Sequence, residues 1–440
     1  MKNFLYGTTA LIAVGLVAGG AAAQQAAPAQ AAAEPLKLSI TGNWQMFAGF
    51  GKQSSAYTAS PGVAATNSQP GAGRRNHGLV REGEVHFSGQ TTLANGMKVG
   101  LRVELEAQGV GDTATEGAGA GNTTSANVAA AGVNSNTIDE SFGFFDASWG
   151  RLEFGATWGA SLKMHYAGYN PIPNFGNLQN LGFIAGATST TNVTAISTYN
   201  VPSGKNDKVS LYTPRVYGLQ FGMSYTPEGS ATARQGHNGT FGIDDTVAQQ
   251  SQIMEYALNY VNKFGAVDVA VAGTFAQSRK EIGRNSATPS TDAQLSADDR
   301  QAYGVGLNVK AFGVEAGGSW LHDNRGLKNP ARDRQTWEIG VGYTMGPASF
   351  GIQYLEAKAD DLNDATANSA TMTKHTDKHT MWQVGGTYNL GPGIDLIGGV
   401  QWNDIENGCR VGQTACTTQA VKQATENKAT IVVFGTRLRF

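Results

Sequence analysis

Residues 97–106 read MKVGLRVELE, with an apolar side chain at each odd position and a polar side chain or glycine at each even position. Because successive side chains of a β-strand point to opposite faces, this stretch predicts a strand with one apolar and one polar face. An α-helix would spread the same charges around its surface. The alternation returns at 151–158, 217–225 and 432–440. The chain is therefore expected to be all-β.

The connections between such segments alternate in length. Seven short turns are expected at 95–96, 149–150, 216–218, 263–265, 311–313, 345–347 and 390–393. Eight long polar connections are expected at about 51–78, 109–136, 159–206, 227–249, 279–298, 323–332, 359–377 and 405–427. Together they join sixteen strands, with short turns at one end and long loops at the other. This sorting is typical of an antiparallel transmembrane β-barrel with short periplasmic turns and long extracellular loops.

The composition excludes several classes of protein. Of 440 residues, 58 are glycine and 15% are charged, with a formal net charge of −2. A disordered chain has high net charge and few aromatic residues, whereas this one has 18 Phe, 14 Tyr and 7 Trp. Past the first 25 positions no apolar run is long enough for a helical membrane span. Near-balanced charge also argues against a nucleic-acid partner.

The N-terminal residues predict export. Lys2 is followed by an apolar core at 10–18 (ALIAVGLVA), which is too short to span a membrane, and by an A-x-A cleavage site at 21–23. The next residues are of low complexity and are expected to be flexible. The expected organisation is a signal peptide at 1–23, a lead-in at 24–35 and a barrel at 36–440.

The two cysteines, Cys409 and Cys416, lie close together in a polar segment of a chain bound for an oxidising compartment. A local disulfide is the prediction for such a pair. The alternative, a metal site, would need further ligands, and none of the seven His lies nearby in the sequence.

Six short segments carry a family resemblance. They are 82–87 (EGEVHF), 94–100 (ANGMKVG), 138–141 (IDES), 149–155 (WGRLEFG), 212–219 (YTPRVYGL) and 437–440 (RLRF). Together they resemble the general porins of Gram-negative bacteria, particularly those of alphaproteobacteria, over roughly residues 36–440. The resemblance implies a sixteen-stranded barrel in the outer membrane, a homotrimer, and passive diffusion of small hydrophilic solutes without a cofactor.

The resemblance also implies partners for assembly. In such porins a terminal phenylalanine, with apolar residues at every second position before it, is the signal read by the outer-membrane assembly machinery. The matching residues here are Phe434, Leu438 and Phe440. Outer-membrane lipid and lipopolysaccharide are the other partners expected.

The connection at 159–206 is the longest, and in this family the third loop folds into the barrel and narrows it. A structureless connection of that length needs a functional reason, and constriction of the lumen is one. The alternative is a surface loop that shields the outer rim. The residues expected at the constriction are Lys163, His165, Tyr166, Asn170 and Asn174.

This loop departs from the family pattern, because it contains no Asp or Glu and its only Lys and Arg residues are Lys163 and Lys205. Related porins place acidic loop residues opposite a basic wall. A strong transverse field is therefore not expected, and ion selectivity should be weak. An uncharged, amide-rich and aromatic loop leaves open a channel selective for sugars or anions.

The polar positions of several strands should line the pore. They are Glu82, Glu84, His86, Lys98, Arg102, Glu104, Glu106, Arg151, Glu153, Arg437 and Arg439. The alternative for each charge is pairing with a neighbour, for example Arg102 with Glu84, which would brace the barrel without steering ions.

Aromatic residues near strand ends are expected in girdles at the membrane interfaces. They are Trp44, Phe47, Phe50, Trp149, Trp158, Tyr225, Trp337, Trp382, Trp402 and Phe440. Neither a metal site at His375 and His379 nor a catalytic Ser/His/Asp set is expected, so an outer-membrane enzyme or adhesin ranks below the two channel hypotheses.

Overall fold

The computed structural model describes residues 33–53, 76–106, 138–173, 175, 197–229, 250–281, 298–326, 333–362, 374–406 and 427–440. The predicted signal peptide, most of the lead-in, both cysteines and Asn174 lie outside these residues, so what was expected of them stays a prediction.

Sixteen strands form where the sequence predicts them. They are β1 (Lys37–Gln53), β2 (His77–Thr92), β3 (Lys98–Glu106), β4 (Ile138–Ala147), β5 (Gly150–Ala156), β6 (Asp207–Tyr212), β7 (Leu219–Glu228), β8 (Gln250–Phe264), β9 (Val267–Lys280), β10 (Arg300–Ala311), β11 (Val314–Asp323), β12 (Arg334–Met345), β13 (Ala348–Leu362), β14 (Lys374–Gly391), β15 (Ile394–Glu406) and β16 (Asn427–Arg439). The helix α2 (Ala160–Lys163) lies in the third long connection. No helix in the described part of the chain is long and apolar enough to cross a membrane.

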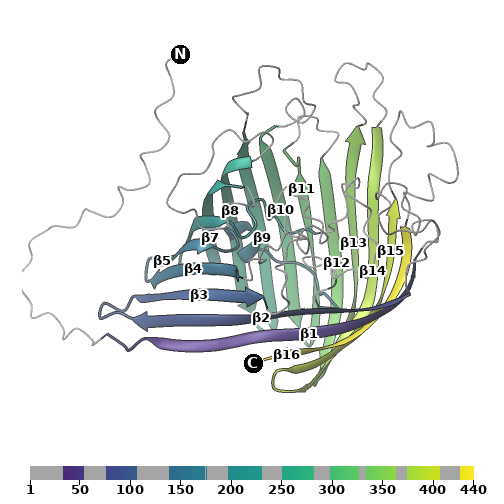
Figure 1. Cartoon of the computed structure of the whole chain (residues 1–440), viewed down its shortest axis with the longest axis horizontal. Coiled ribbons are helices and arrows are strands. Elements are labelled where there is room, and N and C mark those ends of the chain that lie inside the picture. Colours follow the sequence, from purple (N-terminus) through teal and green to yellow (C-terminus); the bar gives the residue numbers. More distant parts are fainter. Residues whose placement is uncertain are drawn as a thin grey trace, which may run out of the picture.

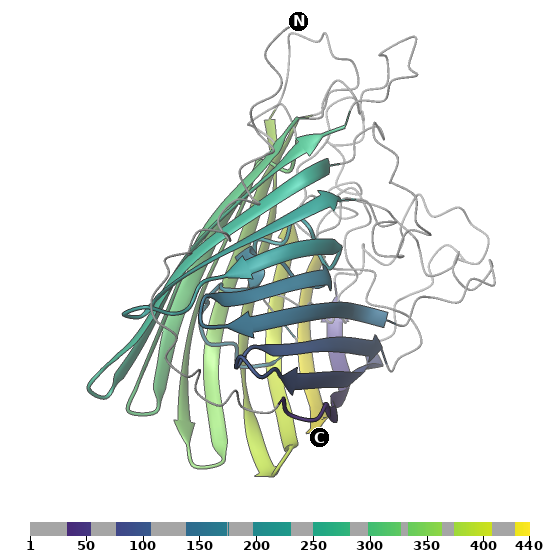
Figure 2. The same ribbon diagram turned by 90° about the vertical axis from the view of Figure 1, so that its left-hand side faces the viewer.

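Every strand pairs antiparallel with its neighbours in sequence, and β1 also pairs with β16, so the sheet is a closed barrel. Figure 2 shows the short hairpin turns gathered at one end of the barrel, with the C-terminus at the same end. In Figure 1 the long strands β8–β15 rise steeply, whereas β1–β5 run more nearly across the view. The strands range from 6 residues in β6 to 18 in β14, so many exceed the roughly 9 to 11 residues that cross a bilayer.

The strands present an apolar outer face and a polar inner face. In β12, Trp337, Ile339 and Val341 are exposed on the outside, while Thr336 and Glu338, at alternate positions, are buried. The same alternation follows β10, β14 and β16. Closure satisfies the backbone hydrogen bonds, and the outer face is suited to lipid.

An aromatic belt runs across the outer face of six consecutive strands, β10–β15. Its members are Tyr303, Trp320, Trp337, Tyr354, Trp382 and Trp402. Trp320 lies opposite Trp337, and Trp382 lies opposite both Tyr354 and Trp402 in the strand register. Such a row is typical of the girdle at a membrane interface.

Two of the residues expected in girdles lie elsewhere. Phe47 is fully buried on the inner face, where its ring meets Phe175 at 4.9 Å in an edge-on arrangement. Trp158 follows β5 and lines a cavity of the lumen, with the Lys205 ammonium 5.0 Å from its ring. The girdle prediction is wrong for both, because the long third connection supplies apolar and cationic partners inside the barrel.

Candidate functional site: the lumen and its inner loop

The inner face of β2–β5, called here the charged wall, collects most of the predicted pore-lining residues. The register places Glu84 opposite Glu106, and Glu104 opposite both His86 and Glu140. Like charges directly opposite one another destabilise a sheet unless opposite charges compensate them. The wall therefore needs cations close by.

Those cations come from both the wall and the third connection. Arg102 pairs with Glu104, and one of its amino groups (Nη2) lies 3.0 Å from His86 Nδ1, whose Nε2 is 2.8 Å from Glu84 Oε2. Arg102 thus pairs with Glu104 rather than with Glu84, because Glu84 is engaged by His86 and by Asn43. The charges brace one another and still border the lumen.

The stem of the third connection supplies two lysines. Lys163 Nζ is 2.5 Å from Glu153 Oε2, while Arg151 Nε donates to Glu153 Oε1 at 2.7 Å. Lys205 pairs with the buried Asp139. Both lysines of the loop therefore lie on the charged wall, as counter-ions to its carboxylates.

A cavity of about 450 Å³ lies between the charged wall and this stem. It is lined by Glu84, Arg102, Glu104, Glu140, Phe142, Arg151, Glu153, Trp158, Lys163 and Lys205. Among the described residues, two sets have ligand atoms close enough to hold a metal ion: Glu84 with His86 and Glu104, and Glu84 with Glu106 and Asp139. Arg102 and Lys205 already pair with members of these sets, so the arrangement is that of a mixed-charge surface.

The third connection leaves β5 and enters the barrel. Its two ends are joined by one buried carboxylate, Glu255 of β8, which accepts hydrogen bonds from Ser161 N at 3.2 Å, from Ser161 Oγ and from Ser203 Oγ. Residues 159–175 and 197–206 are called here the inner loop. Because Glu255 is on the polar side of a closed barrel, these contacts place the inner loop inside the lumen.

From α2 the inner loop crosses the inner faces of the strands in order. Asn308 Nδ2 of β10 donates to the Ala167 carbonyl at 2.8 Å, and Gly168 N donates to Glu338 Oε1 of β12 at 2.7 Å. Gln383 Nε2 of β14 then donates to Asn170 Oδ1 at 2.7 Å.

The far end of this segment is apolar. Phe175 and Ile172 are fully buried in a cluster with Phe47, Ile397, Ala429, Ile431 and Val433 from the last strands and β1. The inner loop therefore contacts the charged wall only through its stem, at Lys163 and Lys205, and from there runs along β7–β16 to β1.

One histidine of the loop is half-buried, with its ring nitrogens turned away from water. Both ring nitrogens of His165 are buried without a hydrogen-bond partner among the described residues, and its ring lies 4.6 Å from that of Tyr199. Burial lowers the pKa of His165 to about 4. Burial, and then the nearby charge of Glu338, raises the pKa of Tyr199 to about 12. Both side chains are therefore neutral at pH 7.

The other predicted residues are distributed along the barrel. Glu82 is buried and accepts a hydrogen bond from Gln45. Lys98 is exposed at the short-turn end of β3. Arg437 Nη2 and Arg439 Nη2 lie 2.9 and 2.8 Å from Asp395 Oδ2, also near that end. None of these four residues lines the cavity between the charged wall and the stem.

Several residues that hold or face the loop were missed from the sequence. They are Asp139, Glu140, Phe142, Glu255, Glu338 and Gln383. The signal was present for Glu338 and Gln383, since each is a polar residue between two exposed apolar ones in a strand. Nothing local distinguished them from other inward residues.

Comparison with known proteins agrees with this architecture. A family model described as Gram-negative porin matches residues 7–408. Comparison with curated protein sequences finds no significant match. Among solved structures, the anion-selective porin from Comamonas acidovorans is 16% identical, with 92% of this chain and 100% of that chain covered and a TM-score of 0.54.

Two further structures resemble the chain. OmpT of Vibrio cholerae, in a trimer form, is 11% identical, with 92% and 100% of the two chains covered and a TM-score of 0.52. OmpF of Salmonella typhi, in a complex with daunomycin, is 14% identical, with 92% and 97% covered and a TM-score of 0.52. At these identities the likeness concerns the fold. Since the family model covers most of the chain and the barrel has the matching architecture, the protein belongs to the Gram-negative porin family of outer-membrane channels, through which small hydrophilic solutes diffuse passively.

Proposed function

We propose that the narrowest part of this channel lies between the inner loop and the charged wall, and that it passes small solutes and ions with weak selectivity. The observation that carries the proposal is the course of the inner loop, which is bound to β8, β12 and β14 on one side of the lumen. The charges of Glu84, Glu104 and Arg102 border the space that remains.

Weak selectivity follows from the pairing of these charges. Glu153 lies between Arg151 and Lys163, so the loop adds positive charge where carboxylates already stand. A mixed surface attracts ions of both signs, and screening limits each charge to about 10 Å at 0.1 M salt. We infer a channel without catalytic activity.

Single-channel recording in planar bilayers tests the proposal. The wild-type protein should give steady, ohmic conductance with a reversal potential near zero in a salt gradient. A strong cation or anion preference would contradict it.

The alternative is a channel selective for anions or sugars. The similarity to an anion-selective porin and the absence of acidic residues in the loop favour it. Concentration-dependent block of the current by one class of solute, together with a clear anion preference, would support this alternative over the diffusion pore.

We also propose a homotrimer, which the trimeric form of the Vibrio cholerae protein supports.

The C-terminal strand is proposed as the assembly signal. Its residues Phe434, Leu438 and Phe440 are exposed on the outer face of β16 and its end, where an assembly factor could read them. Deletion of Phe440 should lower the yield of assembled protein in the outer membrane while export continues. Equal yields of folded trimer would argue against this role.

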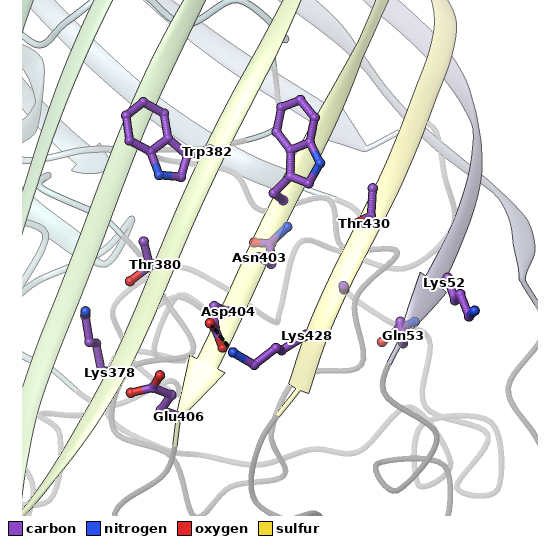
Figure 3. Close-up of a pocket in the computed structure, with 12 residues that line it drawn as sticks. Lys52, Gln53, Lys378, Thr380, Trp382, Asn403, Asp404, Glu406, Lys428 and Thr430 are labelled. Carbon is purple, nitrogen blue, oxygen red and sulfur yellow. Dashed lines mark hydrogen bonds and ion pairs between the residues drawn. The ribbon is translucent and has the colours of Figure 1, made fainter.

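Outer-leaflet lipopolysaccharide is a further proposed partner. A depression of about 720 Å³ lies at the long-loop end of β14–β16 and β1 (Figure 3). Trp382 and Trp402 of the aromatic belt form one side of it, beside Lys52, Lys378 and Lys428. The indoles suit the acyl chains and the lysines suit the phosphates of the headgroup. Replacing the three lysines by Gln should lower the lipopolysaccharide that copurifies with the protein.

A further inference from the structure

The wall beneath the inner loop repeats one arrangement on six consecutive strands. On the inner face of each strand from β10 to β15, a glycine and a polar residue lie two positions apart. The pairs are Gly306 with Asn308, Gly317 with Ser319, Gly340 with Glu338, Gly351 with Gln353, Gly385 with Gln383, and Gly399 with Gln401.

The glycines of neighbouring strands face each other. Gly317 lies opposite Gly340, and Gly385 lies opposite both Gly351 and Gly399 in the register. Gly342, also on the inner face, lies opposite Gly351. From β11 to β15 they form a strip of bare backbone across the sheet, and Gly306 of β10, which lies opposite Ser319, continues it diagonally; these glycines are called here the glycine strip.

The inner loop lies directly on this strip. A Cβ atom added at Gly306 would overlap the Tyr166 carbonyl, and one at Gly340 would overlap the backbone of Tyr169. Gly168 of the loop is equally confined, since its Cβ would lie 2.6 Å from Gly340 N and 2.7 Å from the Gly317 carbonyl. Real Cβ atoms essentially never come closer than 3.0 Å to such neighbours. Backbone therefore packs against backbone.

Side chains of the loop use the same strip. A Cβ at Gly342 would meet three atoms of the Tyr169 ring before any other group, and one at Gly385 would lie 2.5 Å from Ile172 Cγ1. Only glycine leaves room for a ring or a branched side chain at these positions.

The polar partners form a second strip. Gln401 Nε2 donates to Gln383 Oε1 at 3.0 Å, Gln383 Nε2 donates to Gln353 Oε1 at 2.5 Å, and Gln353 Nε2 donates to Glu338 Oε2 at 2.9 Å. Asn308, Glu338 and Gln383 also bind the loop. The polar strip fixes the position of the loop, and the glycine strip fixes its distance from the wall.

We propose that the glycine strip sets the bore of the channel, because it lets the inner loop lie flat against one wall and so keeps the opposite side open. This inference rests on the proposed role of the inner loop as the constriction. Each glycine acts through the loop, so these are positioning residues.

The test compares Gly340→Ala and Gly306→Ala with the wild type by single-channel conductance and by the size of sugars that enter protein-containing liposomes. A methyl group between wall and loop should displace the loop into the lumen and lower the conductance by roughly twofold, since pore diameter governs permeation. Gly304→Ala is the matched control, because Gly304 is on the inner face of β10 but the nearest neighbours of its Cβ all belong to the barrel wall.

A double variant isolates the contact. Gly342→Ala alone should lower the conductance, whereas in the Tyr169→Ala background it should change nothing, because the ring that it would displace is gone. If the wall variants fail to fold, Gly168→Ala provides the same test, because Gly168 belongs to the inner loop and not to the sheet.

Unchanged or raised conductance in the folded glycine variants would overturn the proposal, as would an equal loss in Gly304→Ala. The role of the inner loop is tested separately by Lys163→Glu. If Lys163→Glu shifts the reversal potential while the glycine variants conduct normally, only the glycine strip is refuted; if neither has an effect, the constriction lies elsewhere.

Discussion

The two sides of the lumen are built from different residues. The charged wall lines the cavity with Glu84, Glu104 and Arg102, whereas the wall of β10–β15 presents glycines, amide side chains and the carboxylate of Glu338 to the inner loop. The carboxylates of the charged wall are largely buried and are compensated by Arg102, Arg151, Lys163 and Lys205. The wall that receives a chain segment must be thin and must satisfy every buried polar group. The comparison teaches that β10–β15 hold the middle of the inner loop, whereas the charged wall holds only its stem and borders the cavity beside it.

The largest effect on this arrangement is expected from Glu255→Ala. The variant removes the acceptor that joins both ends of the inner loop through Ser161 and Ser203. Each hydrogen bond to a charged group contributes about 1.5 to 3 kcal/mol, so the loop should detach from the wall and move within the lumen, and the single-channel current should become noisy and lower on average.

Glu255→Gln is the control for this experiment, since it keeps one carbonyl acceptor and nearly the same shape. It should behave between the wild type and Glu255→Ala. Steady, wild-type current from the alanine variant would show that the loop is held without this carboxylate.

The next largest effect is expected from charge reversal at the cavity between the charged wall and the inner loop. Arg102→Glu and Lys163→Glu each place a negative charge at the cavity between wall and loop. Each should move the reversal potential in a salt gradient toward cation preference, by on the order of 10 mV at low salt and less at high salt. Lys263→Glu, at an exposed short turn, is the control and should have little effect.

A substitution in the wall of β10–β15 that changes no charge should alter the current without altering ion selectivity. Gln383→Leu removes the donor to Asn170 Oδ1 and to the Phe175 carbonyl, at an expected cost of about 1 to 3 kcal/mol in loop attachment. Recordings should show more frequent flicker at an unchanged reversal potential. A shift in reversal potential would mean that the two walls do not divide their tasks.

The effect of pH is the smallest under neutral conditions, because it appears only in acid. The pKa of His165 falls from about 6.5 in the free chain to about 4 when the loop is docked, because burial disfavours the imidazolium. Docking is therefore unaffected above pH 6.5 and weakens as the pH falls from 6.5 to 4, by about 3 kcal/mol in all. Current noise should rise over this range in the wild type and not in His165→Phe.

The strands and turns could be predicted because their signals are local. Alternation at 97–106 fixes which side chains point outward, and glycines with positive φ, such as Gly96 and Gly265, mark tight turns. The course of the inner loop could be expected only through the family resemblance. The residues that contact it, among them Glu255 and Gly340, cannot be told from other inward-facing residues by their sequence alone.

The partners of single residues were the hardest to predict. Phe47 has the aromatic character of a girdle residue, yet packing against Phe175 places it inside. Arg102 pairs with Glu104 on its own strand, a choice decided by the competition of His86 and Asn43 for Glu84. Such outcomes depend on several side chains at once, and strand periodicity carries no information about them.

The pairing of β1 with β16 gives the barrel a distinctive folding problem. Every other pair joins strands adjacent in sequence, whereas this one brings Asn43 opposite Arg439 and locks the last residue, since Phe440 exchanges backbone hydrogen bonds with Gly42 at 3.0 and 3.1 Å. Until that pair forms, both terminal strands are open edges whose amide groups have no partner in lipid. Closure of the ring thus converts a row of independent hairpins into one cooperative unit, and a chain that lost its final strand would leave two open edges in the bilayer rather than a slightly smaller barrel.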